Sequence, residues 1–213
     1  MKTDELIGVL ATGADALDLP RRRRRLALVQ ISGILVALVL SLAVLKVNPH
    51  LGLETTEPTF WVREAFCLTL GLTALRAVGR LGIPGHGLGR LPWGVAIPTL
   101  AVWILAAASL IVAPASARVP LILGHTARAC PFLITLLAVA PFGGFILSLR
   151  ALAPTRLRWA GAAAGLAAGA FSAFAYSLHC PELAPAFFGA WYLLGMLIPT
   201  ALGAWCGPRL LRW

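Results

Sequence analysis

Two of the four cysteines share one local context, because Cys130 and Cys180 are each followed directly by a proline. Pro131 and Pro181 fix the backbone beside each sulfur, at a helix end or in a turn. A pair of thiols can form a structural disulfide, can be oxidised reversibly, or can bind a soft ion such as Cu(I), Zn(II) or Cd(II). We interpret Cys130 and Cys180 as a redox-active or metal-binding pair. A permanent disulfide and two unrelated buried thiols are the alternatives.

Other polar residues add little to this chemistry. His125 and His179 are close to the two cysteines in sequence and are weaker candidate ligands of a metal ion. Cys67 and Cys206 lie within apolar stretches, where cysteine commonly serves as a small packing residue. The carboxylates show no paired spacing and there is no Cys-x-x-Cys motif, so the sequence predicts no enzyme. The adjacent Arg63 and Glu64 are compatible with an ion site or with side chains that extend to a membrane surface.

The elements that position these residues are long and apolar. Hydrophobic residues make up 59% of the 213-residue chain and charged residues only 12%, against about 25% charge in a soluble domain. Six segments are long enough to cross a bilayer as helices: 26–45, 60–78, 93–113, 130–149, 157–178 and 187–206. The sequence therefore predicts an all-α, polytopic membrane protein with a six-helix transmembrane domain over residues 26–213.

The two cysteines are expected at the same depth in this bundle. Cys130 precedes Arg150 by 20 residues, which is about 30 Å of helix. Cys180 follows Arg158 by 22 residues, which is about 33 Å. Both would reach the outer interface at nearly the same height, on segments that are consecutive along the chain.

Basic residues predict the orientation. Five consecutive arginines precede the first apolar segment: Arg21, Arg22, Arg23, Arg24 and Arg25. With six spans, 14 of the 18 Lys and Arg residues fall on the side of both termini, which predicts that both termini are cytoplasmic. The remaining four are Lys46, Arg63, Arg118 and Arg128. We therefore expect a multi-pass protein of a bacterial inner membrane. The preference of Lys and Arg for the cytoplasmic side of a membrane explains the net charge of +10, which therefore does not indicate nucleic-acid binding.

We expect residues 1–25 to form a separate cytoplasmic segment with an amphipathic helix. Its apolar stripe comprises Leu6, Ile7, Leu10, Ala14 and Leu17, and Asp4 and Glu5 lie in its first turn. A helix on the membrane surface is one interpretation, but such helices usually carry basic polar faces. The acidic face favours a groove on a protein partner. In the fifth apolar segment, Gly161, Gly165 and Gly169 are four residues apart, which predicts close helix packing within the bundle rather than a dimer contact.

The chain resembles the NrsF family in its opening MKTDELI, in Ala129-Cys130-Pro131, and in His179-Cys180-Pro181 with the following Phe-Phe-Gly-Ala-Trp-Tyr. Members are bacterial inner-membrane anti-sigma factors that negatively regulate the extracytoplasmic-function sigma factor F. The resemblance implies that the N-terminal segment holds the sigma factor at the membrane. It also implies that Cys130 and Cys180 take part in sensing heavy-metal or oxidative stress. The rival interpretation is a small metal transporter or a thiol-redox protein that uses the same cysteines.

Overall fold

The computed structural model describes residues 3, 8 and 19–212. The predicted partner-binding residues Asp4, Glu5, Leu6, Ile7, Leu10, Ala14 and Leu17 lie outside the described residues. Every regular element among the described residues is a helix, which confirms the all-α class.

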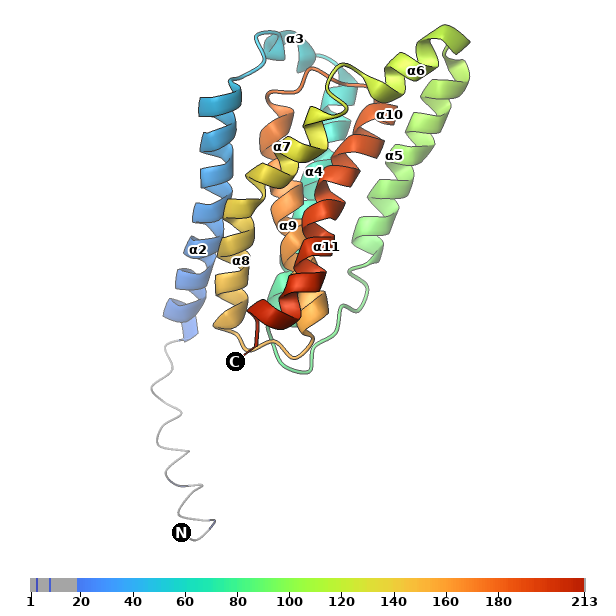
Figure 1. Cartoon of the computed structure of the whole chain (residues 1–213). Coiled ribbons are helices and arrows are strands. Elements are labelled where there is room, and N and C mark those ends of the chain that lie inside the picture. The colour runs from blue at the N-terminus through green and yellow to red at the C-terminus, as the bar shows by residue number, and fades with distance from the viewer. Residues whose placement is uncertain (1–2, 4–7, 9–18, 213) are drawn as a thin grey trace.

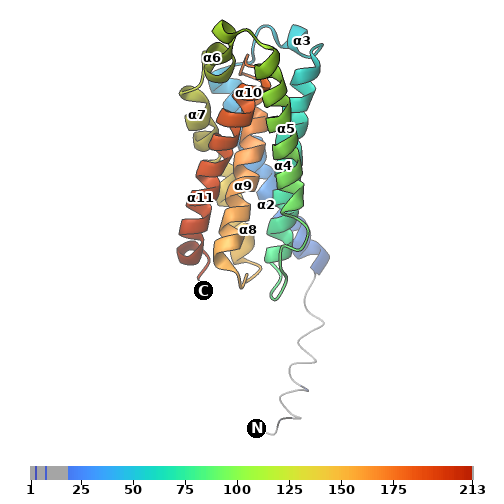
Figure 2. The ribbon, with the colours of Figure 1, turned by 90° about the vertical axis from the view of Figure 1, so that its right-hand side faces the viewer.

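The helices run between two ends of one bundle (Figure 1). The long elements are α2 (Leu19–Leu40) with η2 (Ser41–Leu45), α4 (Pro58–Leu81), α5 (Trp93–Val112), α7 (Ala129–Leu137) with α8 (Val139–Arg150), α9 (Leu157–Ser177), and α10 (Pro185–Phe187) with η3 (Phe188–Tyr192) and α11 (Leu193–Leu210). Two short helices, α3 (Leu51–Glu54) and α6 (Ala115–Leu123), lie at one end, which we call the cysteine end. The opposite end carries the start of α2, the loops 82–92 and 151–156 and the end of α11, and we call it the arginine end (Figures 1 and 2).

Four helices are long and apolar enough to cross a membrane: Arg24–Leu45, Trp93–Val112, Ala129–Arg150 and Pro185–Leu210. Large apolar side chains such as Leu28, Val39, Trp103 and Ile104 point outward from α2 and α5, which indicates a membrane protein. The other two segments of the predicted six are α4 and α9. α4 carries charged side chains and α9 is rich in Ala and Gly, so neither is as apolar as the four, and six spans remain a prediction.

The helix α9 forms the centre of the bundle. It packs against α11 and α4, and also against α8, α7 and α2. A Cβ atom on Gly161 would overlap the backbone oxygen of Gly203, and one on Gly165 would overlap that of Pro199. The glycine pattern therefore brings α9 and α11 into backbone contact within the chain, as the sequence predicts.

A break divides the fourth predicted span into α7 and α8 at Ala138. Pro141 has no N–H to donate to Leu137, four residues earlier, which accounts for the break. α8 then packs closely on α2, because a Cβ on Gly33 would lie 2.8 Å from Cα of Pro141 and one on Gly144 would lie 2.8 Å from the oxygen of Val29. The helix α8, which follows α7 and its Cys130, is thus in direct contact with α2, the helix that contains the arginine run.

Candidate functional site

The structure places Cys130 and Cys180 together in the core of the cysteine end. Cys130 lies in the first turn of α7 and Cys180 lies in the turn after α9, and both side chains are fully buried. Thr126 contacts both residues. Its hydroxyl lies 3.7 Å from Sγ of Cys180, and its backbone oxygen accepts a 2.9 Å hydrogen bond from the N–H of Cys130. All four cysteines of the chain are free thiols.

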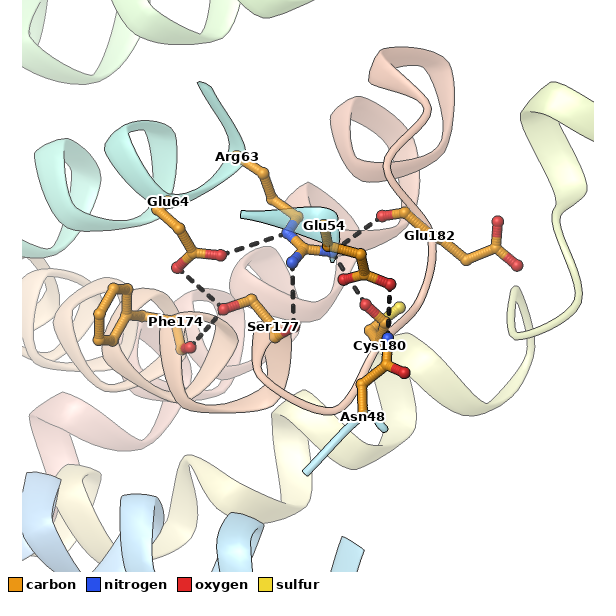
Figure 3. A network of polar contacts seen from close by, with 8 residues as sticks. All are labelled: Asn48, Glu54, Arg63, Glu64, Phe174, Ser177, Cys180 and Glu182. Atoms are coloured by element: carbon orange, nitrogen blue, oxygen red, sulfur yellow. Dashed lines mark hydrogen bonds and ion pairs between the residues drawn. The ribbon is translucent and has the colours of Figure 1, made fainter. Parts of the chain in front are cut away.

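The turn that carries Cys180 is held by Arg63 of α4 (Figure 3). The guanidinium donates hydrogen bonds to the backbone oxygens of Ser177 (3.0 Å), Cys180 (3.0 Å) and Glu182 (2.9 Å). Its side chain is 0% exposed and also lies over the rings of Phe60 and Tyr192, at 5.3 and 6.0 Å from their centroids. Arg63 therefore fixes the backbone around Cys180 and leaves the sulfur uninvolved.

Glu64 compensates the buried charge of Arg63. One carboxylate oxygen lies 3.3 Å from Nε of Arg63, and the other accepts a 2.9 Å hydrogen bond from the hydroxyl of Ser177. A buried ion pair persists only when its remaining polar atoms are bonded in this way. Extension to a membrane surface, one of the two sequence interpretations of Arg63 and Glu64, is therefore wrong.

Cys67 lies one helical turn beyond Arg63 and is buried in the same core as Cys130 and Cys180. The sequence interpretation treated Cys67 and Cys206 alike, but the structure separates them. Cys206 is partly exposed near the arginine end of α11, so only Cys67 is close to the predicted pair.

Neither predicted histidine joins the thiols through its ring. The side chain of His125 is exposed, and its backbone N–H donates a 2.7 Å hydrogen bond to the carboxylate of Glu182. The Nδ1 atom of His179 lies 3.0 Å from the backbone oxygen of Lys46. Within the described part of the chain, no three His, Cys, Asp or Glu side chains are placed to hold a metal ion. Two thiols alone supply fewer donors than the four that a closed structural zinc site uses.

Sequence reasoning named Arg63 and Glu64 as a possible ion site but did not connect them with the cysteine pair. The adjacent opposite charges of Arg63 and Glu64 inside an apolar segment were a usable signal, because such charges are costly unless they are paired. Thr126 and Ser177 carried no signal, since their roles depend on partners that are 54 and 113 residues away along the chain.

The arginine end collects most of the basic residues. Among the described residues, this end carries Arg21, Arg22, Arg23, Arg24, Arg25, Arg76, Arg80, Arg90, Arg150, Arg156, Arg158, Arg209 and Arg212. The cysteine end carries Lys46, Arg63, Arg118 and Arg128. The basic residues that were assigned to opposite sides of the membrane from sequence therefore also lie at opposite ends of the bundle.

Comparison with known proteins agrees with the sequence resemblance. The family described as "NrsF: Negative regulator of sigma F" matches residues 10–213. A protein of Azospira oryzae named probable anti-sigma-F factor NrsF is 46% identical over 213 residues, and the anti-sigma-F factor NrsF of Caulobacter vibrioides is 39% identical over 215 residues. Each alignment covers 100% of both chains. No solved structure matches the chain. The chain therefore belongs to the NrsF family of negative regulators of sigma F.

Proposed function

We propose that this chain is a membrane-bound anti-sigma factor with both termini in the cytoplasm of a bacterium. Its N-terminal segment sequesters an extracytoplasmic-function sigma factor at the inner membrane and releases it under heavy-metal or oxidative stress. The full-length similarity to two proteins named as anti-sigma-F factors carries this proposal. The apolar helices and the arginine-rich end support the membrane placement.

The partner-binding surface in this proposal is the apolar stripe Leu6, Ile7, Leu10, Ala14 and Leu17, with Asp4 and Glu5 setting its orientation. The stripe ends directly before the arginine run that begins α2. A sigma factor held there would be kept at the membrane surface and away from RNA polymerase.

The sensor is the thiol pair Cys130 and Cys180. Oxidation to a disulfide joins the two sulfurs and transfers two protons and two electrons to an oxidant of the outer compartment. Both sulfurs are buried, so the reaction requires a local opening of the cysteine end. The frame formed by Arg63, Glu64 and Ser177 sets how readily that opening occurs.

The structure offers a route from this sensor to the N-terminal segment. Cys130 begins α7, which continues into α8 across the break at Ala138. The close contacts at Gly33 and Gly144 join α8 to α2, and α2 starts at the arginine run. A signal can act through this route only if the stressed and resting arrangements of α7 and α8 differ in free energy of sigma-factor binding.

The partner-binding part is tested in the full chain with Leu10→Asp. Thr12→Asp, on the opposite face of the predicted helix, is the matched control. Burying one leucine contributes about 1.5–3 kcal/mol, or one to two decades in affinity. We expect Leu10→Asp to release the sigma factor from membrane fractions, while Thr12→Asp retains it. Equal retention by both variants would place the interface outside residues 1–25.

The sensor is tested with Cys130→Ser, Cys180→Ser and the double variant, using a sigma-F-driven reporter with and without cadmium or peroxide. Either sulfur alone cannot form the pair, so all three variants should show the same altered stress response, with strong non-additivity. Cys206→Ser, on the distant half of α11, is the control and should respond as the parent does. Normal responses of both single variants would remove the pair as a sensor.

A further inference from the structure

An apolar cavity of about 590 Å³ lies between α4, α5, α9 and α11, in the half of the bundle towards the arginine end. Each of the four helices contributes to its wall, for example through Ala77, Val95, Ala162 and Leu197. Loop 82–92 lines it towards the arginine end with Leu88 and Leu91. Figure 1 shows α5 standing apart from the lower part of α11.

The few polar atoms in the wall are already bonded. The hydroxyls of Thr73, Thr99 and Thr200 donate to the backbone oxygens of Gly94, Val95 and Met196. A cavity whose polar groups are satisfied gives water no partners, so its natural content is apolar.

Arginines gather where loop 82–92 covers the cavity. A Cβ on Gly89 would lie 3.2 Å from Nη2 of Arg80, and one on Gly87 would lie 3.9 Å from Nη1 of Arg156. Arg90 directly precedes the wall residue Leu91. We call Arg80, Arg90, Arg156 and Arg158 the basic collar.

The collar lacks counter-charges within the described part of the chain. All four side chains are exposed, and none forms an ion pair with a described residue. The described carboxylates Glu54, Glu57, Glu64 and Glu182 all belong to the cysteine end. Exposed Trp93 and Trp159 lie at the same level as the collar, which is the position that tryptophan favours at the lipid headgroups.

We propose that the cavity binds an acyl chain of an anionic phospholipid whose phosphate is held by the basic collar. The apolar wall accommodates the chain, but the surrounding lipid tails are equally apolar, so the cavity alone gives no selectivity. Selectivity comes from the arginines, since basic side chains at the cytoplasmic membrane surface attract anionic headgroups. The inference rests on the membrane placement in the proposed function and adds a ligand to it.

The test is native mass spectrometry of the full chain released from membranes of equal parts phosphatidylglycerol and phosphatidylcholine with matched acyl chains. We expect the parent to retain phosphatidylglycerol in preference to phosphatidylcholine. The double variant Arg80→Gln/Arg156→Gln should lower that preference about tenfold or more. The control Arg209→Gln, Arg212→Gln removes the same charge from the end of α11 and should keep the preference.

A second pair of variants tests the cavity without changing charge. Ala162→Phe fills it from α9 and should abolish retention, whereas Ala101→Phe on the exposed side of α5 should not. Equal retention of both lipids by the parent, or equal effects of the collar and control variants, would overturn the site. If either of these outcomes is found while the parent still inserts and holds the sigma factor, only the lipid site is overturned. Failure to insert would overturn both proposals.

Discussion

Arg63 holds the backbone of the turn that carries Cys180. Its three hydrogen bonds go to carbonyl oxygens of the turn, while the sulfur of Cys180 lies beside the hydroxyl of Thr126. The sulfur of Cys180 therefore remains a free thiol, while the backbone bonds of Arg63 fix where it lies and how easily a reagent reaches it. Cys67 shares the same core, so an opening of this region exposes a third thiol as well.

At this scale, we predict that Arg63→Ala speeds alkylation of Cys130 and Cys180 by a maleimide about tenfold or more. Removing one partner of a buried ion pair costs about 3–5 kcal/mol, because Glu64 is left without its counter-charge. A fraction of that loss is enough, since about 1.4 kcal/mol corresponds to a tenfold change. The rates are measured by mass spectrometry of the membrane-embedded chain with Cys67→Ser and Cys206→Ser in the background.

The control for this measurement is Arg118→Ala, which removes an exposed arginine at the same end of the bundle. It should leave both alkylation rates within about twofold of the parent, since exposed charges contribute little to stability. Unchanged rates in Arg63→Ala would mean that the hydrogen bonds of Arg63 to residues 177–182 do not limit access to the thiols.

Among the helices, α9 sets how tightly the bundle closes. We predict that Gly165→Leu strongly destabilises the protein, because the new side chain would meet the backbone oxygen of Pro199, which cannot rotate away. Overpacking typically costs about 1–3 kcal/mol, and a backbone clash belongs at the upper end of that range. The melting temperature of the detergent-solubilised chain measures the effect.

Gly143→Leu is the matched control, because a Cβ on Gly143 of α8 meets nothing within 4 Å. It should melt at or above the temperature of the parent, since leucine favours a helix more than glycine does. Equal melting temperatures for Gly165→Leu and the parent would show that α9 and α11 are not in the backbone contact described here.

The helices also show which features a sequence can predict. Apolar length located the long segments, and the spacing of Gly161, Gly165 and Gly169 predicted close packing, but only the structure identified α11 as the partner. Local pattern could not reveal the bonds of Arg63, because its acceptors are 114 to 119 residues away along the chain. Helix length predicted a shared depth for Cys130 and Cys180, and the structure places both in one core, while their action as a pair stays a proposal.

On the scale of the whole molecule, the two ends have different chemistry. The cysteine end holds buried thiols and the ion pair of Arg63 and Glu64, while the arginine end presents exposed positive charge on several loops and helix termini. The helix α9 spans 21 residues between them, which is about 30 Å or the thickness of the hydrocarbon core. A signal at one end must therefore be carried by helices to act at the other.

This asymmetry predicts the orientation of the chain in the membrane. Arginine-rich ends stay in the cytoplasm because moving their charges across the bilayer is unfavourable. We expect alkaline phosphatase, which is active only outside the cytoplasm, to be inactive when fused after Trp213 and active when inserted after Thr56 beside α3. A cytoplasm-active fluorescent protein at the same two positions should give the opposite pattern, which controls for expression. Phosphatase activity at Trp213 would place the thiols on the cytoplasmic side, where the reducing environment keeps cysteines as thiols and an oxidative sensor would need a different chemistry.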